Sequence, residues 1–245
     1  MANEDVREFQ KYKTRGAYHW EQISNNLLRR NTFILGRYNN VINLLKNKIG
    51  SLNGKKILDV GCGDGVLSYL VAKQGAEVSG IGYSDIAIEF AKEKSKRLKI
   101  DFKQGSAYEL PFKDNSFDAV ISSDVIEHLE DVPTYLSEIN RVCKNGGTVV
   151  ITTPIKYTEI PLDPEHVIEW FPNEFKNVIS SQFKSCEFKQ SHSLVLHEII
   201  QAQLLGKRWY NLIFNILSFI HNPFDGFINK FKQNVLQYAV IKVVK

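Results

Sequence analysis

The chain has 245 residues, 43% of them hydrophobic and 24% charged, and this ordinary globular composition excludes collagen-like and wholly disordered proteins. Its three cysteines are far apart and form no CxxC pair, so we expect neither a disulfide framework nor a zinc knuckle, and a reducing, cytoplasmic location is the default. The formal net charge of +4 arises from residues 1–53, which hold 9 Lys or Arg against 4 Asp or Glu.

This basic segment is compatible with contact to nucleic acid or to anionic lipid. A solvated helical face is the simpler interpretation, and we expect no nucleic-acid partner. The first residues are charged, and no run of about 18 apolar residues occurs in the chain. We therefore expect neither a secretory signal nor a transmembrane helix.

Residues 1–53 are predicted to form an N-terminal helical arm, or cap. Between Ile34 and Ile49 the apolar residues recur at helical spacing, and Gly50 and Gly54 end the pattern. From residue 54 onward, short apolar strands alternate with helices, which predicts a doubly wound parallel sheet. The strands are predicted at 56–60, 77–81, 100–104, 117–121 and 148–152, and the helices at 66–73, 84–98 and from Asp131 to Gly146-Gly147.

The end of the chain has a different composition. The core is predicted to occupy residues 54–194. Residues 195–237 are rich in apolar and aromatic side chains and are predicted to form a helical insertion. Residues 238–245 are predicted to contain the closing strand of the core sheet.

Three alternating glycines follow the first predicted strand, in the segment Asp59-Val60-Gly61-Cys62-Gly63-Asp64-Gly65. In an open α/β sheet, ligands bind at the carboxyl ends of the strands, and glycines there let the backbone approach a ligand closely with positive φ. A P-loop would need Gly-Lys-Ser/Thr, and a dinucleotide fingerprint would need GxGxxG, and neither is present. The acid just before the loop would repel a pyrophosphate but suits a ligand with an ammonium group.

The segment from Ile57 to Gly65 resembles the first motif of class I S-adenosylmethionine-dependent methyltransferases. The similarity covers roughly residues 55–155, and Asp163 to Phe171 also resembles a segment of many small-molecule members. The further motifs are Leu110-Pro111-Phe112, Asn115-Ser116-Phe117-Asp118, Glu127-His128-Leu129 and Gly146-Gly147. The resemblance implies an α/β fold: a Rossmann-like, doubly wound, mostly parallel seven-stranded sheet with N-terminal helices and a helical C-terminal insertion.

The resemblance also implies S-adenosyl-L-methionine as the cofactor. It places Asp59 near the methionine ammonium group, and the backbone from Gly61 to Gly63 beneath the ribose and methionine. The implied cofactor-binding residues are Asp59, Gly61, Cys62, Gly63, Gly82, Tyr83, Ser106, Ala107 and Ser123.

Two of these positions depart from the family's pattern. Family members usually end the second strand with an acid that accepts both ribose hydroxyl protons, and this chain has Gly82 there. Members often carry an acid for the adenine amino group where this chain has Ser106, whose hydroxyl accepts a hydrogen bond without charge. The departures predict weak cofactor binding unless water or a nearby side chain compensates.

Two histidines are the candidate catalytic residues. His166 follows the fifth strand in a loop expected to roof the pocket, and Asp163 is placed to orient its imidazole as a general base for a hydroxyl. His128 follows the fourth strand and is a candidate base or substrate-positioning group. For both histidines, a purely structural role in fixing the loop is the alternative. Methyl transfer requires no metal, and the histidine spacing shows no HxxxH pair, so no metal site is expected.

Two apolar or aromatic segments have candidate roles outside the catalytic step. Tyr18-His19-Trp20 is a candidate cap over the cofactor or substrate, with simple packing of Trp20 as the equal alternative. Residues 209–220 hold nine apolar side chains in twelve, with a narrow polar stripe and flanking basic residues. This segment is expected to be buried as core or lid, to form a homodimer contact, or to lie on an anionic membrane surface.

The resemblance implies methyl transfer from S-adenosyl-L-methionine to a small-molecule acceptor, with an oxygen nucleophile as the expected acceptor atom. The segment after the fifth strand and the apolar C-terminal helices are similar to those of methyltransferases that act on glycans or lipid-linked intermediates, so the resemblance implies an acceptor of that class. One alternative is an amine, protein or RNA methyltransferase, although no Asn-Pro-Pro-Tyr-type tetrapeptide follows the fourth strand. The other alternative is a non-catalytic scaffold that has lost cofactor use, which Gly82 and Ser106 suggest.

Overall fold

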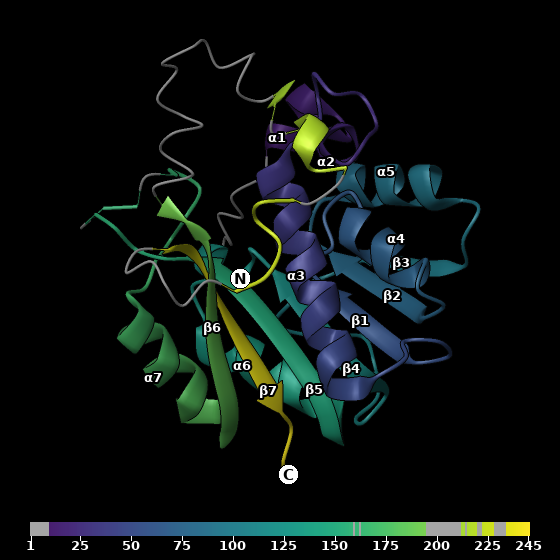
Figure 1. Ribbon diagram of the computed structural model, residues 1–245. Helices are drawn as coiled ribbons and strands as arrows, with labels where there is room; N and C mark the ends of the chain where they lie inside the picture. Colours follow the sequence, from purple (N-terminus) through teal and green to yellow (C-terminus); the bar gives the residue numbers. More distant parts are fainter. Residues whose placement is uncertain are drawn as a thin grey trace.

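The computed structural model describes residues 10–158, 160–161, 163–194, 212–213, 215–219, 222–227 and 234–245. It contains a seven-stranded sheet in the order β3-β2-β1-β4-β5-β7-β6, with helices on both faces (Figure 1). The neighbours from β3 to β5 are parallel, and β7 runs antiparallel to both β5 and β6. The predicted α/β, doubly wound, mostly parallel seven-stranded fold is confirmed.

The first half of the sheet follows the predicted alternation closely. The elements are β1 (Lys56–Val60), α4 (Val66–Ala72), β2 (Glu77–Gly82), α5 (Asp85–Ser95) and β3 (Ile100–Gln104). β1 is buried on both faces after its first residue, as its unbroken apolar run requires. α5 begins where the Ser84 hydroxyl accepts a hydrogen bond from the Ala87 backbone N–H at 3.3 Å.

The second half of the parallel sheet differs from the prediction at one helix end. Its elements are β4 (Phe117–Ser123), the short 3-10 helix η1 (Ile126–His128), α6 (Val132–Val142) and β5 (Cys143–Pro154). The predicted helix from Asp131 to Gly146-Gly147 therefore ends too late, because Cys143 is extended and pairs with Phe117 in β4. Both glycines lie within β5, where Gly146 has φ +78°.

The sheet is completed by segments far apart in the chain. α7 (Pro172–Gln182) and β6 (Ser185–Ser193), which the sequence did not predict individually, lead to the outer strand. β7 (Asn234–Lys242) inserts between β5 and β6 and starts at Asn234 rather than Tyr238, because it already pairs there with Ser193.

Two apolar layers hold the helices on the sheet. One layer packs α6 and α7 on one face through large buried side chains such as Tyr135, Ile139 and Phe175. The other packs α3 (Thr32–Ile49) and α4 on the opposite face through Leu45, Val71 and their neighbours. Both faces are therefore covered, as a parallel sheet requires.

The predicted N-terminal arm contains two short helices, α1 (Gln10–Arg15) and α2 (Tyr18–Gln22), before α3. Most of the predicted C-terminal insertion lies outside the described residues. Within it, residues 212–213 and 215–217 are helical. No helix among the described residues is long and apolar enough to cross a membrane.

Candidate functional site

The glycine loop lies between the carboxyl end of β1 and the start of α4. Gly61, Gly63 and Gly65 all have positive φ, at +76°, +52° and +81°. A Cβ added to Gly61 would overlap the Val125 side chain, and one added to Gly63 would overlap the Tyr12 hydroxyl. The backbone therefore makes two close approaches that only glycine allows, at the sheet edge where ligands bind.

Asp59 lies beneath this loop rather than exposed beside it. Asp59 is only 2% exposed, and one of its carboxylate oxygens accepts a hydrogen bond from the Ser68 hydroxyl of α4 at 2.6 Å. Burial raises the pKa of Asp59 to about 7. The carboxyl thus joins β1 to α4, the two elements that flank the loop, and its predicted contact with a ligand ammonium group stays a prediction.

The N-terminal arm closes over the glycine loop through Asp64. The Asp64 carboxylate accepts from the backbone N–H of His19 and lies 3.1 Å from the His19 Nδ1. The Trp20 indole N–H donates to the Asp64 carbonyl oxygen at 2.7 Å, while its ring packs 4.8 Å from that of Tyr69. His19 and Trp20 of the predicted cap therefore reach the loop directly.

Lys11 extends this closure to the segment after β5. Its ammonium group forms ion pairs with Asp163 at 3.2 Å and with Glu165 at 2.5 Å. The arm therefore bridges the glycine loop and the loop that carries His166.

The two positions that depart from the family's pattern lie at the ends of β2 and β3. Gly82 is the last residue of β2, and its φ lies outside the left-handed region. A Cβ there would lie 3.4 Å from Ile88 Cδ1 and 3.5 Å from Cys62 Sγ, which leaves room for a side chain. The Ser106 hydroxyl accepts from the Tyr108 backbone N–H at 3.1 Å, and its second lone pair is compatible with a further donor.

The remaining candidate cofactor residues are distributed around the same edge. Tyr83 is 46% exposed, and its carbonyl accepts from the Gln104 side chain. Ala107 packs against the core beside α6. The Ser123 hydroxyl, at the end of β4, is 2.9 Å from the Thr152 hydroxyl of β5.

A buried ion pair adjoins Ser123. Asp124 has φ +54°, accepts a hydrogen bond from the Thr152 hydroxyl at 3.1 Å and pairs with Arg37 of α3. The Arg37 Nε is buried and has no hydrogen-bond partner among the described residues. Arg37 therefore places a positive charge at this end of β4, and the sequence alone did not single it out.

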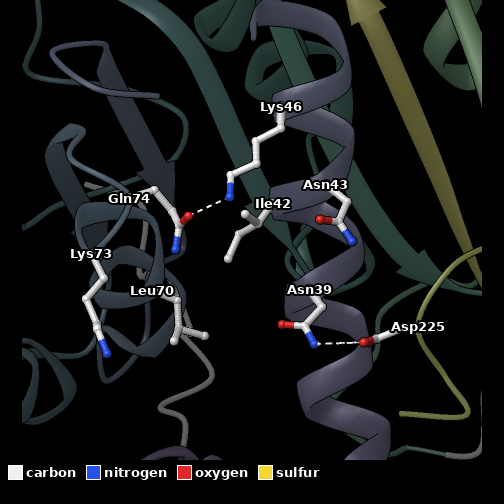
Figure 2. Close-up of a pocket in the computed structure, with 8 residues that line it drawn as sticks. All are labelled: Asn39, Ile42, Asn43, Lys46, Leu70, Lys73, Gln74 and Asp225. Carbon is white, nitrogen blue, oxygen red and sulfur yellow. Dashed lines mark hydrogen bonds between the residues drawn. The ribbon is translucent and has the colours of Figure 1, made fainter. Parts of the chain in front are cut away.

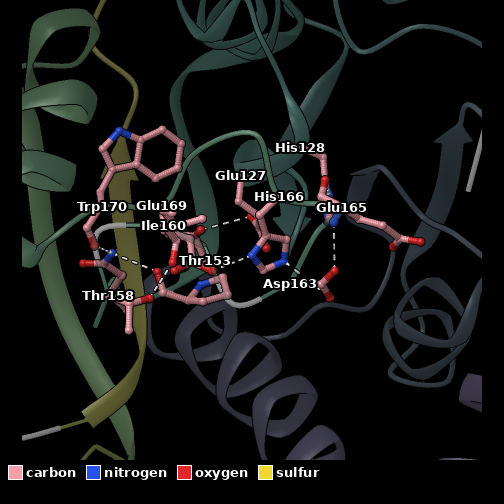
Figure 3. A network of polar contacts seen from close by, with 12 residues as sticks. Glu127, His128, Thr153, Thr158, Ile160, Asp163, Glu165, His166, Glu169 and Trp170 are labelled. Carbon is pink, nitrogen blue, oxygen red and sulfur yellow. Dashed lines mark hydrogen bonds and ion pairs between the residues drawn. The ribbon is translucent and has the colours of Figure 1, made fainter. Parts of the chain in front are cut away.

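The two candidate catalytic histidines do come together (Figure 3). The ring centroids of His128 and His166 are 4.9 Å apart, and the rings meet edge to face. His128 Nδ1 lies 2.8 Å from the Glu165 carbonyl oxygen, so this nitrogen is the donor. Burial lowers the pKa of His128, and a neutral ring keeps its lone pair on Nε2.

His166 is oriented by a different carboxylate from the predicted one. Its Nδ1 lies 2.6 Å from Glu169 Oε1, whereas Asp163 is 4.0 Å from Nε2, which is too long for a hydrogen bond. Asp163 instead accepts from the Glu165 backbone N–H and pairs with Lys11. Glu169 is thus the orienting partner, a role that Asp163 was expected to have.

Glu127 is a second acid that the sequence did not single out for this site. It is fully buried, one carboxylate oxygen accepts from the Thr153 hydroxyl at 3.0 Å, and the other has no hydrogen-bond partner among the described residues. Burial raises its pKa to about 7. Its backbone carbonyl accepts from Val167 and Ile168, which ties the His166 loop to η1.

Glu127, His128 and His166 form the one group of potential metal ligands found among the described residues. Their ligand atoms lie within 4.8 Å of one another. With bonds of about 2.1 Å to zinc, two ligands on opposite sides of the ion are at most ~4.2 Å apart. The 4.8 Å limit allows spacings on either side of this value, and the absence of a metal site stays a prediction.

A separate hollow of about 320 Å³ lies between α3 and α4 (Figure 2). Lys46 and Gln74 join across one end of it at 2.5 Å, and Asn39 and Asp225 join at the other end at 3.0 Å. None of the predicted site residues lines it.

Comparison with known proteins finds a match for the central part of the chain. Residues 58–151 match the family model described as a methyltransferase domain. This match agrees with the methyltransferase motifs that these residues carry.

The chain is similar to a ubiquinone biosynthesis O-methyltransferase from Pelagibacter ubique, with 35% identity over 127 residues that cover 49% of this chain and 52% of the relative. It is also similar to a demethylmenaquinone methyltransferase from Staphylococcus aureus, with 39% identity over 128 residues that cover 46% of this chain and 53% of the relative. The chain thus spans about half the length of these curated relatives.

Among solved structures, the fold resembles phosphoethanolamine N-methyltransferase 2 from Haemonchus contortus in complex with S-adenosyl-L-methionine. The TM-score is 0.64 at 20% identity, and the match covers 98% of this chain and 61% of the other. At this identity the likeness concerns the fold.

Proposed function

We propose that this protein transfers a methyl group from S-adenosyl-L-methionine to a hydroxyl of a small molecule. The observation that carries the proposal is the loop of positive-φ glycines at the carboxyl end of β1, within a methyltransferase domain. The quinone-directed methyltransferases among its relatives support a small-molecule acceptor.

The cofactor, when bound, supplies a methyl carbon on a positively charged sulfur. His166 is proposed as the base: Glu169 holds its Nδ1–H, which leaves the Nε2 lone pair to take the proton of the acceptor hydroxyl. With the proton held by His166, the acceptor oxygen would take the methyl group that the bound cofactor supplies, and the sulfur would keep the electron pair of its bond to that carbon; a methyl ether and S-adenosylhomocysteine would be the products. His128, one ring away, is proposed to position the acceptor.

Asp59, Gly61, Cys62, Gly63, Gly82, Tyr83, Ser106, Ala107 and Ser123 are proposed to line the cofactor site. The finer acceptor class, a glycan or lipid-linked intermediate, is also part of the proposal. It is supported by the resemblance of the segment after β5 and of the apolar C-terminal segment to methyltransferases that act on such acceptors. A reducing, cytoplasmic setting fits the three free cysteines.

The first experiment is calorimetric titration with S-adenosyl-L-methionine and S-adenosylhomocysteine. Binding of both supports the enzyme, whereas absence of binding by folded protein favours the non-catalytic scaffold. The second is mass spectrometry of metabolites that carry a labelled methyl group, with and without the protein. A labelled amine, RNA or protein in place of a methyl ether would overturn the hydroxyl as the acceptor.

A further inference from the structure

The described part of the C-terminal insertion turns its polar side chains toward the protein. Asn215 is 1% exposed and donates to the carbonyl oxygens of Leu27 at 2.6 Å and Arg30 at 2.8 Å. Asn222 is 3% exposed and donates to the Thr32 carbonyl oxygen at 2.9 Å. These two described members of the polar stripe therefore fix this segment to the N-terminal arm.

The apolar side chains of the same segment point outward. Ile213, Ile216, Leu217 and Phe219 are 48–56% exposed, and Leu28, in the loop that holds Asn215, is 59% exposed. Single exposed apolar residues are common on proteins, but a group on two touching segments marks an interaction surface. We call these five side chains the apolar patch. Its short helical turn lies at the α1 and α2 end of the molecule (Figure 1).

The segments that carry the apolar patch are basic. The Arg29 side chain is 59% exposed and forms an ion pair with Glu21, and the Arg30 guanidinium lies 4.7 Å from the centre of the Phe219 ring. Residues 204–232 contain four Lys or Arg and one acid, Asp225, whose carboxylate accepts from the Asn39 side chain of α3. Apolar side chains are thus combined with positive charge.

Apolar side chains beside positive charge distinguish between two candidates for binding the apolar patch, a second copy of this chain and an anionic lipid surface. In a two-fold contact between copies, the same patch faces itself, so each basic segment would meet its own like charge. An anionic lipid surface accepts the apolar side chains among its acyl chains and the basic side chains among its headgroups. We propose that the apolar patch docks this protein onto an anionic membrane surface. The inference does not depend on the methyl acceptor.

Vesicle co-sedimentation tests it, with phosphatidylcholine alone and with an equal mixture of phosphatidylcholine and phosphatidylglycerol. We expect binding to the mixed vesicles only, weakened by salt. The triple variant Ile216→Ser, Leu217→Ser, Phe219→Ser should bind at least about tenfold more weakly. Arg29→Gln should lower the affinity for the mixed vesicles about fivefold, which is the effect of one basic residue near an anionic surface.

The matched control is Val244→Ser, which removes a 57% exposed apolar side chain near the C-terminus, at the other end of the molecule (Figure 1). It should bind like the wild type, and circular dichroism checks that all variants are folded. Equal binding by the wild type and the triple variant, or no binding by the wild type, overturns the proposal. A dimer in light scattering that the triple variant converts to monomers, without vesicle binding, shows that a second copy is the occupant.

Discussion

At the scale of single residues, Gly82 is the position where the proposed cofactor site most needs explanation. The backbone there is free of the left-handed φ that would exclude other residues, and its nearest contacts to an added Cβ are ordinary at 3.4 and 3.5 Å. The missing carboxylate is therefore not forced by the fold. The backbone conformation and the space around an added Cβ both allow an acid here, which the proposed cofactor site would use for charged hydrogen bonds.

We expect Gly82→Asp to tighten S-adenosylhomocysteine binding at least about fivefold, which corresponds to ~1 kcal/mol. A charged hydrogen bond to a ribose hydroxyl is worth more than this when well formed. Calorimetric titration measures the change, and Gly82→Ala is the matched control without the acid. Equal affinities for the wild type and Gly82→Asp would show that another group already pairs with the ribose.

The second residue-scale prediction concerns the proposed base. His166→Ala should lower turnover by about 10²–10⁴-fold while cofactor affinity stays unchanged. Glu169→Gln should lower turnover and move the pH profile, because Glu169 holds Nδ1 at 2.6 Å.

Asp163→Asn is the matched control for Glu169→Gln, because Asp163 lies 4.0 Å from the ring. The Asp163 charge acts on the ring only through space, so its removal should shift the pH profile less than Glu169→Gln does. If His128→Ala alone shows the large loss, the roles of the two histidines are reversed.

Sequence motifs predicted that these histidines and the glycine loop lie at the same edge of the sheet. This was possible because each follows the carboxyl end of a predicted strand, and parallel strands end at one edge. The motifs did not predict Glu169 as the partner of His166, since the path of a loop decides which nearby acid meets the ring. Arg37 was missed for a related reason. It reaches Asp124 from α3, and nothing local in the sequence records a contact between an N-terminal helix and the end of β4.

At the scale of elements, the N-terminal arm is the part of the site that sequence patterns describe least. α1 and α2 are short, yet Trp20 and His19 reach the glycine loop and Lys11 reaches the loop after β5. Their position comes from tertiary contacts rather than from helix propensity, which is weak in elements of this length. Tertiary contacts also decide where α6 ends. Strand pairing of Cys143 with Phe117 ends the helix before Gly146-Gly147, the glycines that predicted its end.

We expect Trp20→Ala to weaken S-adenosylhomocysteine binding about tenfold, through loss of one hydrogen bond and of ring packing on Tyr69. Trp20→Phe keeps a ring without the N–H donor and should lose only about two- to fivefold. Titration gives the affinities, and hydrogen exchange should show faster opening of α4 in the alanine variant. Unchanged affinity in both variants would mean that the arm does not cover the cofactor.

At the scale of the whole molecule, two buried acids tie stability to pH. Burial raises the pKa of Asp59 from 3.8 to about 7 and that of Glu127 from 4.5 to about 7. Between those values the unfolded chain has lost each proton and the folded protein still holds it, so the free energy of unfolding falls as pH rises. Each group contributes up to ~1.4 kcal/mol per pH unit.

Other groups raise the free energy of unfolding as pH rises, but over different or narrower pH ranges. Ion pairing with Lys189 and Lys48 lowers the pKa of Glu187 to about 2, and the stability it adds is complete near the ordinary pKa of glutamate. Burial lowers the pKa of His128, so this group raises the free energy of unfolding as pH rises, but only near pH 6.5 and below. In that range its effect offsets the opposite effect of one of the two acids. Above about pH 5 the two buried acids outweigh it, so the net slope is negative.

The last prediction isolates Asp59 from this balance. In Asp59→Asn, urea unfolding between about pH 5 and pH 7 should show a slope less negative by up to one proton, since the amide does not titrate. The variant should equal or exceed the wild type in stability near pH 7, where the wild type carries a buried charge on a carboxyl that accepts one side-chain hydrogen bond, from Ser68. Glu187→Gln is the control, because its titration ends below this range and should leave the slope unchanged. Identical slopes in the wild type and Asp59→Asn would mean that Asp59 is already ionised at pH 5, and that the glycine loop rests on a charged carboxylate rather than on a protonated one.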